Sequence, residues 1–269
     1  SFETHWLNSN SLTAEIWVLP NDNDMLNLDL VCLNAKDHNG NLVSDSTYLS
    51  VMSSDMKGPE VLSINTLSTI ISDSLLGSSN YFIDVVFNEP MNMSIKPLVL
   101  HENEIDLNNS IQYNIDQSFF IDPYNYHAIF QINDENIEVA DIDLTISYAK
   151  DFANNTQQAY LETAFTSLDT KNPSIIDLEI NTNELSLNEN QLLFQVLFDE
   201  EMTQNEATQF NLYPFLTPPT ILQQTDFSWI DNDSLNASYE LLSAADEAEV
   251  YDVSVTNSTD LAGNLMVPL

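Results

Sequence analysis

The sequence contains no arginine and only five lysines, against 42 aspartates and glutamates, so its formal net charge is −37. A surface of this kind repels phosphate groups, which makes nucleic acid and anionic lipid poor partners. A single cysteine, Cys32, occurs in 269 residues, so no internal disulfide framework can form. Cys32 lies in an alternating strand pattern, and we expect it to be a small core residue rather than a reactive thiol.

Features typical of enzymes and of membrane proteins are also missing. No hydrophobic run reaches membrane-spanning length, so we expect no membrane insertion in this segment. No signal peptide is visible at the N-terminus either, which decides nothing for a segment of a longer exported protein. There is no glycine-rich phosphate loop, and carboxylates are too abundant for any pair to indicate acid–base catalysis. The histidines show no metal-ligand spacing and share no repeat position; they are His5, His38, His101 and His127. We therefore expect a protein that is not an enzyme.

What the chain does have is an internal repeat with a period of about 110 residues. A shift of 114 residues aligns Trp6 with Phe120, Asp55 with Asp169, Lys57 with Lys171 and Pro59 with Pro173. A shift of 223 residues aligns Trp6 with Trp229, Asp29 with Asp252 and Asp37 with Asp260. A period of this length indicates whole domains in series, and an aromatic content of 10% argues against disorder.

The prolines Pro59 and Pro173 mark the starts of successive repeats, since each follows an Asp-containing segment and stiffens the joint. The boundaries predict three units: residues 1–58 are the C-terminal half of a repeat, residues 59–172 a complete repeat, and residues 173–269 a repeat without its last strand. We interpret the chain as a segment of a longer array. The alternative is that a neighbouring chain supplies the missing strands.

Within each copy, alternating apolar and polar residues predict β-strands. The clearest runs are 28–32, 142–146 and 251–255, which match one another, then 81–87 with 193–198, and 61–65 with 175–180. Short strands about ten residues apart predict an all-β fold of antiparallel sandwiches. Aspartates recur on the outward face of the first set (Asp29, Asp143 and Asp252), where we expect a solvated face rather than a site.

Two further expectations concern local structure. Helical patterns are weak, and the segment from Glu201 to Phe210 is the only candidate for one or two helical turns. The aromatic residues Trp6, Phe120 and Trp229 share one repeat position, and we expect all three to point into a core.

Three motifs recur in the same order. A strand ends in Phe87-Asn88-Glu89-Pro90-Met91, echoed by Phe198-Asp199-Glu200-Glu201-Met202. The strand 251–255 is followed by Asp260-Leu261-Ala262-Gly263-Asn264, and a proline opens each unit. Together they resemble the bacterial immunoglobulin-like repeats of S-layer proteins and large surface adhesins. Two positions depart from that pattern, because Glu201 replaces a proline and Asn154 replaces a glycine.

This resemblance covers nearly the whole chain. It implies tandem immunoglobulin-like sandwiches, an extracellular position on a bacterial cell surface, a non-enzymatic role and calcium at the domain junctions. The residues themselves support calcium at these places, because carboxylate oxygens are the ligands that calcium prefers. The candidate ligands precede each opening proline, close a strand, or lie in the loop after a strand; they are Asp55, Glu89, Asp151, Asp169, Glu200 and Asp260.

Two alternatives to calcium remain at these junctions. Lys57 and Lys171 lie two residues after Asp55 and Asp169, so the lysines could neutralise the carboxylates instead. The loops could also be simple turns, in which the aspartate caps its own backbone and Gly or Asn adopts a positive φ. Asn154, at the position of Gly40 and Gly263 in the other copies, favours the turn.

The sequence therefore predicts a structural stalk or filament segment of a large cell-surface protein, which projects or spaces a distal functional region. Its expected partners are neighbouring copies of the repeat array, with other surface proteins or glycans as further possibilities. One alternative is an adhesive module that binds glycans or another cell's surface, which exposed aromatics grouped on one sheet face would favour. Another is a set of accessory domains of a secreted hydrolase.

Overall fold

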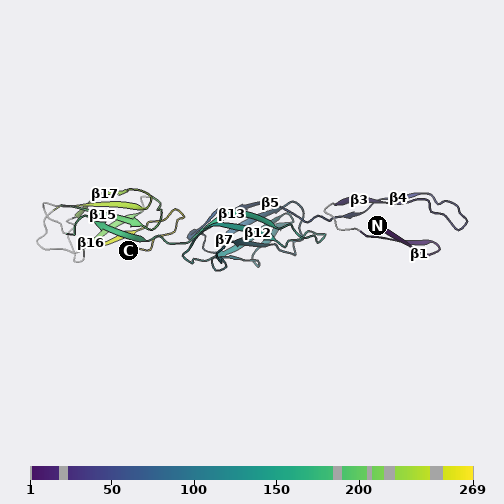
Figure 1. The fold of residues 1–269 in the computed structure, drawn as a ribbon, viewed down its shortest axis with the longest axis horizontal. Coiled ribbons are helices and arrows are strands. Elements are labelled where there is room, and N and C mark those ends of the chain that lie inside the picture. Colours follow the sequence, from purple (N-terminus) through teal and green to yellow (C-terminus); the bar gives the residue numbers. More distant parts are fainter. Residues whose placement is uncertain are drawn as a thin grey trace.

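The computed structural model describes residues 2–17, 24–183, 190–204, 208–214, 222–242 and 251–268 of the chain. We call residues 1–58, 59–172 and 173–269 the first, second and third repeat. The three repeats lie end to end in a row (Figure 1). The regular secondary structure of the described residues consists of β-strands and one short 3₁₀ turn at Asp73–Leu75. No helix in this described part is long and apolar enough to cross a membrane.

The second repeat is a sandwich of two sheets. One sheet has the order β10-β11-β7-β5, with β9 also paired to β11, and the other has the order β6-β13-β12-β8. Their bounds are β5 (Val61–Thr66), β7 (Gly77–Phe87), β9 (Ile111–Tyr113), β10 (Phe119–Asp122) and β11 (Asn125–Ile132) in the first sheet, and β6 (Ile70–Ile71), β8 (Leu98–Glu102), β12 (Glu138–Ser147) and β13 (Tyr160–Asp169) in the second. All pairs are antiparallel except β13 with β6.

Strand alternation builds the core of this sandwich. On β7 the residues Ile83 and Val85 are fully buried, and on β12 the same is true of Ile142, Leu144 and Ile146. Successive side chains of a strand point to opposite faces, so each sheet turns one apolar face inward. The buried residues of the second repeat form a single hydrophobic cluster of their own.

The third repeat has a separate core and repeats the strand order of the first of these sheets, while its other sheet has two strands among the described residues. Its larger sheet has the order β14-β15-β18-β17, and β16 pairs with β19 in the other. The bounds are β14 (Ile175–Ile180), β15 (Gln191–Phe198), β16 (Gln209–Pro214), β17 (Leu222–Trp229), β18 (Ser234–Leu241) and β19 (Tyr251–Thr256). The described chain is thus all-β, and its second and third repeats are β-sandwiches in tandem whose strands are mostly antiparallel.

The expected helical turn at Glu201 to Phe210 is wrong for its described residues, 201–204 and 208–210; residues 205–207 lie outside the described part. Gln209 and Phe210 begin β16, where Phe210 pairs with Val255 and is 3% exposed. Burial of an aromatic side chain between two sheets outweighs the weak local preference for helix.

The first repeat consists of two hairpins, β1 (Phe2–Asn8) with β2 (Ser11–Ile16) and β3 (Met25–Cys32) with β4 (Ser46–Ser54). They correspond to β10–β11 and β12–β13 of the second repeat. Among the described residues, no further strand of this repeat covers their apolar faces. The expected core positions are therefore exposed: Trp6 is 66% exposed, and Cys32 is an exposed free thiol rather than a core residue.

The shared aromatic position thus has three different environments. Phe120 is buried at 9% exposure, and its ring packs on Tyr126 at 4.7 Å between centroids. Trp229 is half-buried against Phe198, at 5.7 Å between ring centroids. The prediction of an inward side chain is confirmed for Phe120, holds in part for Trp229, and is wrong for Trp6, which is exposed.

Two of the three outward aspartates, Asp29 and Asp143, have a structural role. The carboxylate of Asp143 accepts a hydrogen bond from the backbone N–H of Ala164 at 2.8 Å, and Asp29 accepts one from Ser50 at 2.9 Å. Ala164 and Ser50 both have positive φ, at 50° and 52°, where the strand pairing is interrupted. Each aspartate therefore holds a backbone bulge in place, which agrees with the expectation that it is not a site.

Candidate metal centre

Two groups of three carboxylates lie where the linker meets the next repeat. Each residue of a group offers one carboxylate oxygen, and these oxygens lie within 4.8 Å of one another; the groups are Asp55, Glu89 and Asp151, and Asp169, Glu200 and Asp260. The six predicted ligands are thus brought together in two matching sets, which we call the first and the second acidic cluster. In each, one residue directly follows β4 (Asp55) or ends β13 (Asp169), one follows β7 or β15, and one lies in the loop after β12 or β19. We call the short segment from that first aspartate to Pro59 or Pro173 the linker.

The loop aspartate of each cluster is fixed by its own turn. Asp151 accepts a hydrogen bond from the backbone N–H of Asn155 at 2.8 Å, and the Asn155 side chain donates to its other oxygen at 2.8 Å. Asp260 and Asn264 repeat both bonds, at 2.9 and 2.8 Å. Asn154 has a φ of 73° in this turn. The turn interpretation is therefore confirmed, and it holds both buried aspartates, each 1% exposed, in a fixed orientation.

The asparagine of the turn also binds the linker, a role that the sequence analysis did not assign. The Asn264 side chain donates to the backbone oxygens of Asp169 at 2.9 Å and Lys171 at 3.3 Å. Asn155 donates in the same way to the backbone oxygen of Asp55, at 3.1 Å. Asn41, at the equivalent place in the first repeat, is exposed. The sequence contains a sign of this role, because an asparagine follows the loop aspartate by four residues in all three copies.

Asn264 further connects the third repeat to the second. Its side-chain oxygen accepts a hydrogen bond from the backbone N–H of Asp73 at 2.9 Å, and Asp73 begins the 3₁₀ turn of the second repeat. One fully buried amide therefore joins the loop of one repeat, the linker and the end of the preceding repeat. Such a contact restrains the angle between neighbouring repeats.

Close packing of carboxylates changes their electrostatics. Burial, followed by the charges of Asp55 and Asp151, raises the pKa of Glu89 to about 7. Burial likewise raises the pKa of Glu200 to about 7, although Lys171 opposes the shift. The pKa of Asp55 and that of Asp169 are also raised, again by burial first and then by the neighbouring loop aspartate. Each cluster therefore favours binding of a proton or another cation.

The lysine alternative is realised at one joint. Lys171 places its Nζ 2.9 Å from Asp199 and 3.3 Å from Glu200, so it partly neutralises the second acidic cluster. Lys57 instead pairs with Glu60 at 2.9 Å, outside the first acidic cluster. The first cluster is therefore the one without a direct lysine contact.

The oxygen geometry fits calcium. Calcium takes six to eight oxygens at about 2.3–2.6 Å, so oxygens on opposite sides of one ion lie about 4.6–5.2 Å apart. The spacing within each cluster allows all three carboxylates to contact one ion of this size. Backbone oxygens of the linker lie beside them, since Asn155 and Asn264 hold the linker against the loop.

Comparisons with known proteins give little for this chain. No protein-family model and no curated protein matches it. Among solved structures, the crystal structure of bovine butyrophilin is similar at 8% sequence identity, over 78% of this chain and 96% of that one, with a TM-score of 0.29. The fold assignment therefore rests on the sheets and cores described above.

Proposed function

We propose that this chain is a stalk segment of a large extracellular protein on a bacterial surface, with neighbouring copies of the same repeat as its structural partners. The supporting observation is that its sandwiches lie in a row and that the joint is built in the same way twice. At both joints a short linker is bound by an asparagine of the following repeat. Repetition of a joint is what a spacer of defined length requires, and we propose no enzymatic activity.

Calcium strengthens these joints in the proposal. When bound, the ion supplies positive charge to three carboxylates that otherwise repel one another. Asp55 belongs to the linker, whereas Glu89 and Asp151 belong to the body of the second repeat. Holding them on one ion fixes the linker on the repeat. The first cluster is the stronger site, since Lys171 competes with a cation for Glu200 at the second.

Small-angle X-ray scattering of the chain, with calcium and with chelator, tests this function. We expect an elongated particle in both conditions, and a narrower distribution of interatomic distances with calcium because the joints stiffen. The matched variants are Glu89→Gln and Glu200→Gln, which keep side-chain shape and remove one ligand charge. We expect Glu89→Gln to reduce the calcium effect more than Glu200→Gln does.

The outcomes separate the two parts of the proposal. A compact particle, with repeats folded back on one another, contradicts the stalk. An elongated particle whose scattering is identical with calcium and with chelator leaves the stalk standing and removes calcium from it. In that case the asparagine contacts, the opening prolines and the lysine pairs hold the joints.

One observation favours adhesion as a second candidate function. The outer face of the second repeat carries grouped aromatic rings, with Phe82 and Phe119 lying 4.5 and 5.3 Å from the ring of His127. Phe119 is 49% exposed, and Asp84 bonds His127 at 2.6 Å. Aromatic faces beside a carboxylate suit neutral sugars. Binding to an array of neutral oligosaccharides that Phe119→Ala abolishes would support this function, whereas no binding by the wild-type chain would contradict it.

A further inference from the structure

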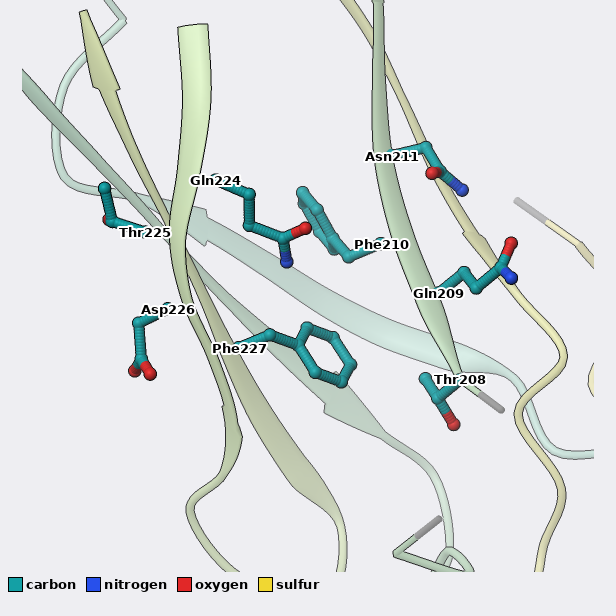
Figure 2. Close-up of a pocket in the computed structure, with 8 residues that line it drawn as sticks. All are labelled: Thr208, Gln209, Phe210, Asn211, Gln224, Thr225, Asp226 and Phe227. Carbon is teal, nitrogen blue, oxygen red and sulfur yellow. The ribbon is translucent and has the colours of Figure 1, made fainter. Parts of the chain in front are cut away.

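The third repeat has an open groove between the edges of its two sheets. The groove has a volume of about 370 Å³ and lies between β16 and β17, with residues 208–211 on one side and 224–227 on the other. Figure 2 shows that the side chains of Phe210, Gln224 and Phe227 point into the gap between the two strands. In the described part of the chain, β16 and β17 are each the outermost strand of their sheet and do not pair with each other.

The same seam is closed in the second repeat. There the Tyr113 hydroxyl donates to the backbone oxygen of Pro97 at 2.7 Å and shares a hydrogen bond with the Tyr126 hydroxyl, also at 2.7 Å. The Nζ of Lys96 adds a bond to the backbone oxygen of Ile115 at 2.7 Å. An aromatic side chain and a lysine thus cross from one sheet to the other.

The strand register shows what replaces Tyr113. Tyr113 pairs with Phe130 on β11, and Gln224 pairs with Tyr239, which occupies the place of Phe130 on β18. Gln224 therefore stands where the second repeat has its tyrosine. Its amide makes no hydrogen bond within the part of the chain that the structure describes, and its side chain is exposed. The groove is consequently the space that a tyrosine ring fills in the neighbouring repeat.

We propose that this groove binds an extended peptide segment of a partner protein and receives one aromatic side chain between Phe210 and Phe227. Phe210 is nearly fully buried and forms the floor, while Phe227 is half-buried and forms one side. Aromatic pairs at such positions stabilise a complex beyond the area that they bury.

Strand edges favour a peptide over a sugar as the occupant. An outermost strand presents a row of unpaired backbone N–H and C=O groups, which another extended chain can satisfy. The charge of the groove selects the peptide further. Asp226 is the one charged residue among those that line the groove, and the chain as a whole has a net charge of −37. The partner segment is therefore neutral or basic, with an aromatic residue at its centre.

A titration of the ¹⁵N-labelled chain followed by NMR tests this site. The probe is a blocked peptide with the sequence Lys-Thr-Val-Tyr-Val-Thr-Lys, compared with the same peptide carrying Ala in place of Tyr and with maltotriose. We expect the tyrosine peptide to shift the side-chain amide signal of Gln224 and the backbone signals of residues 209–211 in a saturable way. The alanine peptide should bind at least about tenfold more weakly, equivalent to about 1.4 kcal/mol.

Two variants report on the groove itself. Gln224→Tyr restores the arrangement of the second repeat, so it should raise the melting temperature. It should also lower the affinity for the tyrosine peptide at least about tenfold. Gln224→Lys keeps an exposed polar side chain, so it should fold normally. Its positive charge repels the basic peptide, so the affinity for the tyrosine peptide should fall as much as in Gln224→Tyr. Equal binding of the two peptides, shifts caused by maltotriose alone, or no shift with any probe would each overturn the proposal.

Discussion

At the scale of single residues, the amide of Asn264 makes the most concentrated set of contacts at either joint. It is fully buried and donates to the carboxylates of Asp260 and Asp169 as well as to the linker backbone. Removing a side chain from such a position leaves several buried acceptors without a partner. Each buried polar group left unpaired costs about 1–3 kcal/mol.

We therefore predict that Asn264→Ala lowers the free energy of unfolding of the third repeat by about 2–3 kcal/mol. Urea unfolding followed by the fluorescence of Trp229, the tryptophan of that repeat, measures the change. Asn41→Ala is the matched control, because Asn41 holds the same place in an exposed copy of the loop. Because Asn41 lies in the first repeat, this variant should leave the transition of the third repeat within about 0.5 kcal/mol of the wild type. A similar loss in both variants would show that the joint contacts add nothing to the turn.

The second residue-scale prediction concerns pH. The pKa of Glu200 is about 7 in the folded protein, above its ordinary value of 4.5. Between these two values the folded state keeps a proton that the unfolded state has lost. The free energy of unfolding therefore falls as the pH rises from about 4.5 to 7, by linkage. Glu89 adds a change in the same direction, because its pKa is also raised to about 7.

In chelator, we expect the melting temperature to fall by roughly 4–8 °C across this window, equivalent to about 1 kcal/mol for a domain of this size. Glu200→Gln should remove part of that fall, because the glutamine never ionises, and combining it with Glu89→Gln should remove most of it. Glu104→Gln, at an exposed position, is the control. Calorimetry at several pH values measures the effect, and an unchanged slope in the double variant would contradict it.

At the scale of elements, the linker into the second repeat passes very close to the loop after β12. A Cβ placed on Gly58 would lie 2.1 Å from the backbone oxygen of Thr156. Next to it, the N–H of Gln158 donates to the backbone oxygen of Pro59 at 3.0 Å. Backbone atoms cannot yield as a flexible side chain would, so any larger residue must push the linker away.

We predict that Gly58→Ala destabilises this contact by about 1–3 kcal/mol, as overpacking does elsewhere. Amide hydrogen exchange at Gln158 gives a local measurement and should become faster. Asn172→Ala is the matched control, since Asn172 aligns with Gly58 under the shift of 114 residues and its buried side-chain oxygen makes no hydrogen bond in the described structure. Unchanged exchange at Gln158 in Gly58→Ala would contradict the prediction.

Strands of the second and third repeats could be predicted from sequence because alternation alone fixes which residues face inward. The expected run 142–146 lies within β12, and its inward residues are fully buried. Trp6 could not be placed in this way, because alternation says which face is apolar but not whether another sheet covers it. The bulge at Ala164 was also beyond prediction, since its partner Asp143 is 21 residues away in the chain.

The acidic clusters were predictable for a similar reason. Their six residues occupy matching repeat positions at or near strand ends. Because these strand ends lie at the same end of a sandwich, the carboxylates are expected to come close together. The bond from Asp73 to Asn264 was not predictable, because it spans 191 residues and two different repeats. The lysine partners were not predictable either: Lys171 contacts Glu200, whereas the equivalent Lys57 contacts Glu60. This difference depends on the backbone course of each linker.

At the scale of the whole molecule, charge is the dominant property. With 42 acidic residues against five lysines, the like charges of neighbouring repeats repel one another. Simple salt relieves long-range repulsion, because the Debye length falls from about 30 Å at 0.01 M to about 3 Å at 1 M ionic strength. A calcium ion bound at an acidic cluster acts differently, because its effect depends on the specific carboxylate ligands. It therefore stabilises the joint at a concentration that hardly changes the ionic strength.

This difference yields the last prediction. Raising sodium chloride from 0.01 to 1 M should raise the melting temperature of the wild type and of the Glu89→Gln/Glu200→Gln variant alike. Millimolar calcium should stabilise the wild type alone, by about 2.7 kcal/mol per site once its concentration reaches 100 times the Kd. Differential scanning calorimetry in matched ionic strength separates the two effects. If calcium and sodium chloride act equally at equal ionic strength, the clusters are screened surface charge, and the stiffness of the joints comes from Asn155, Asn264 and the two opening prolines.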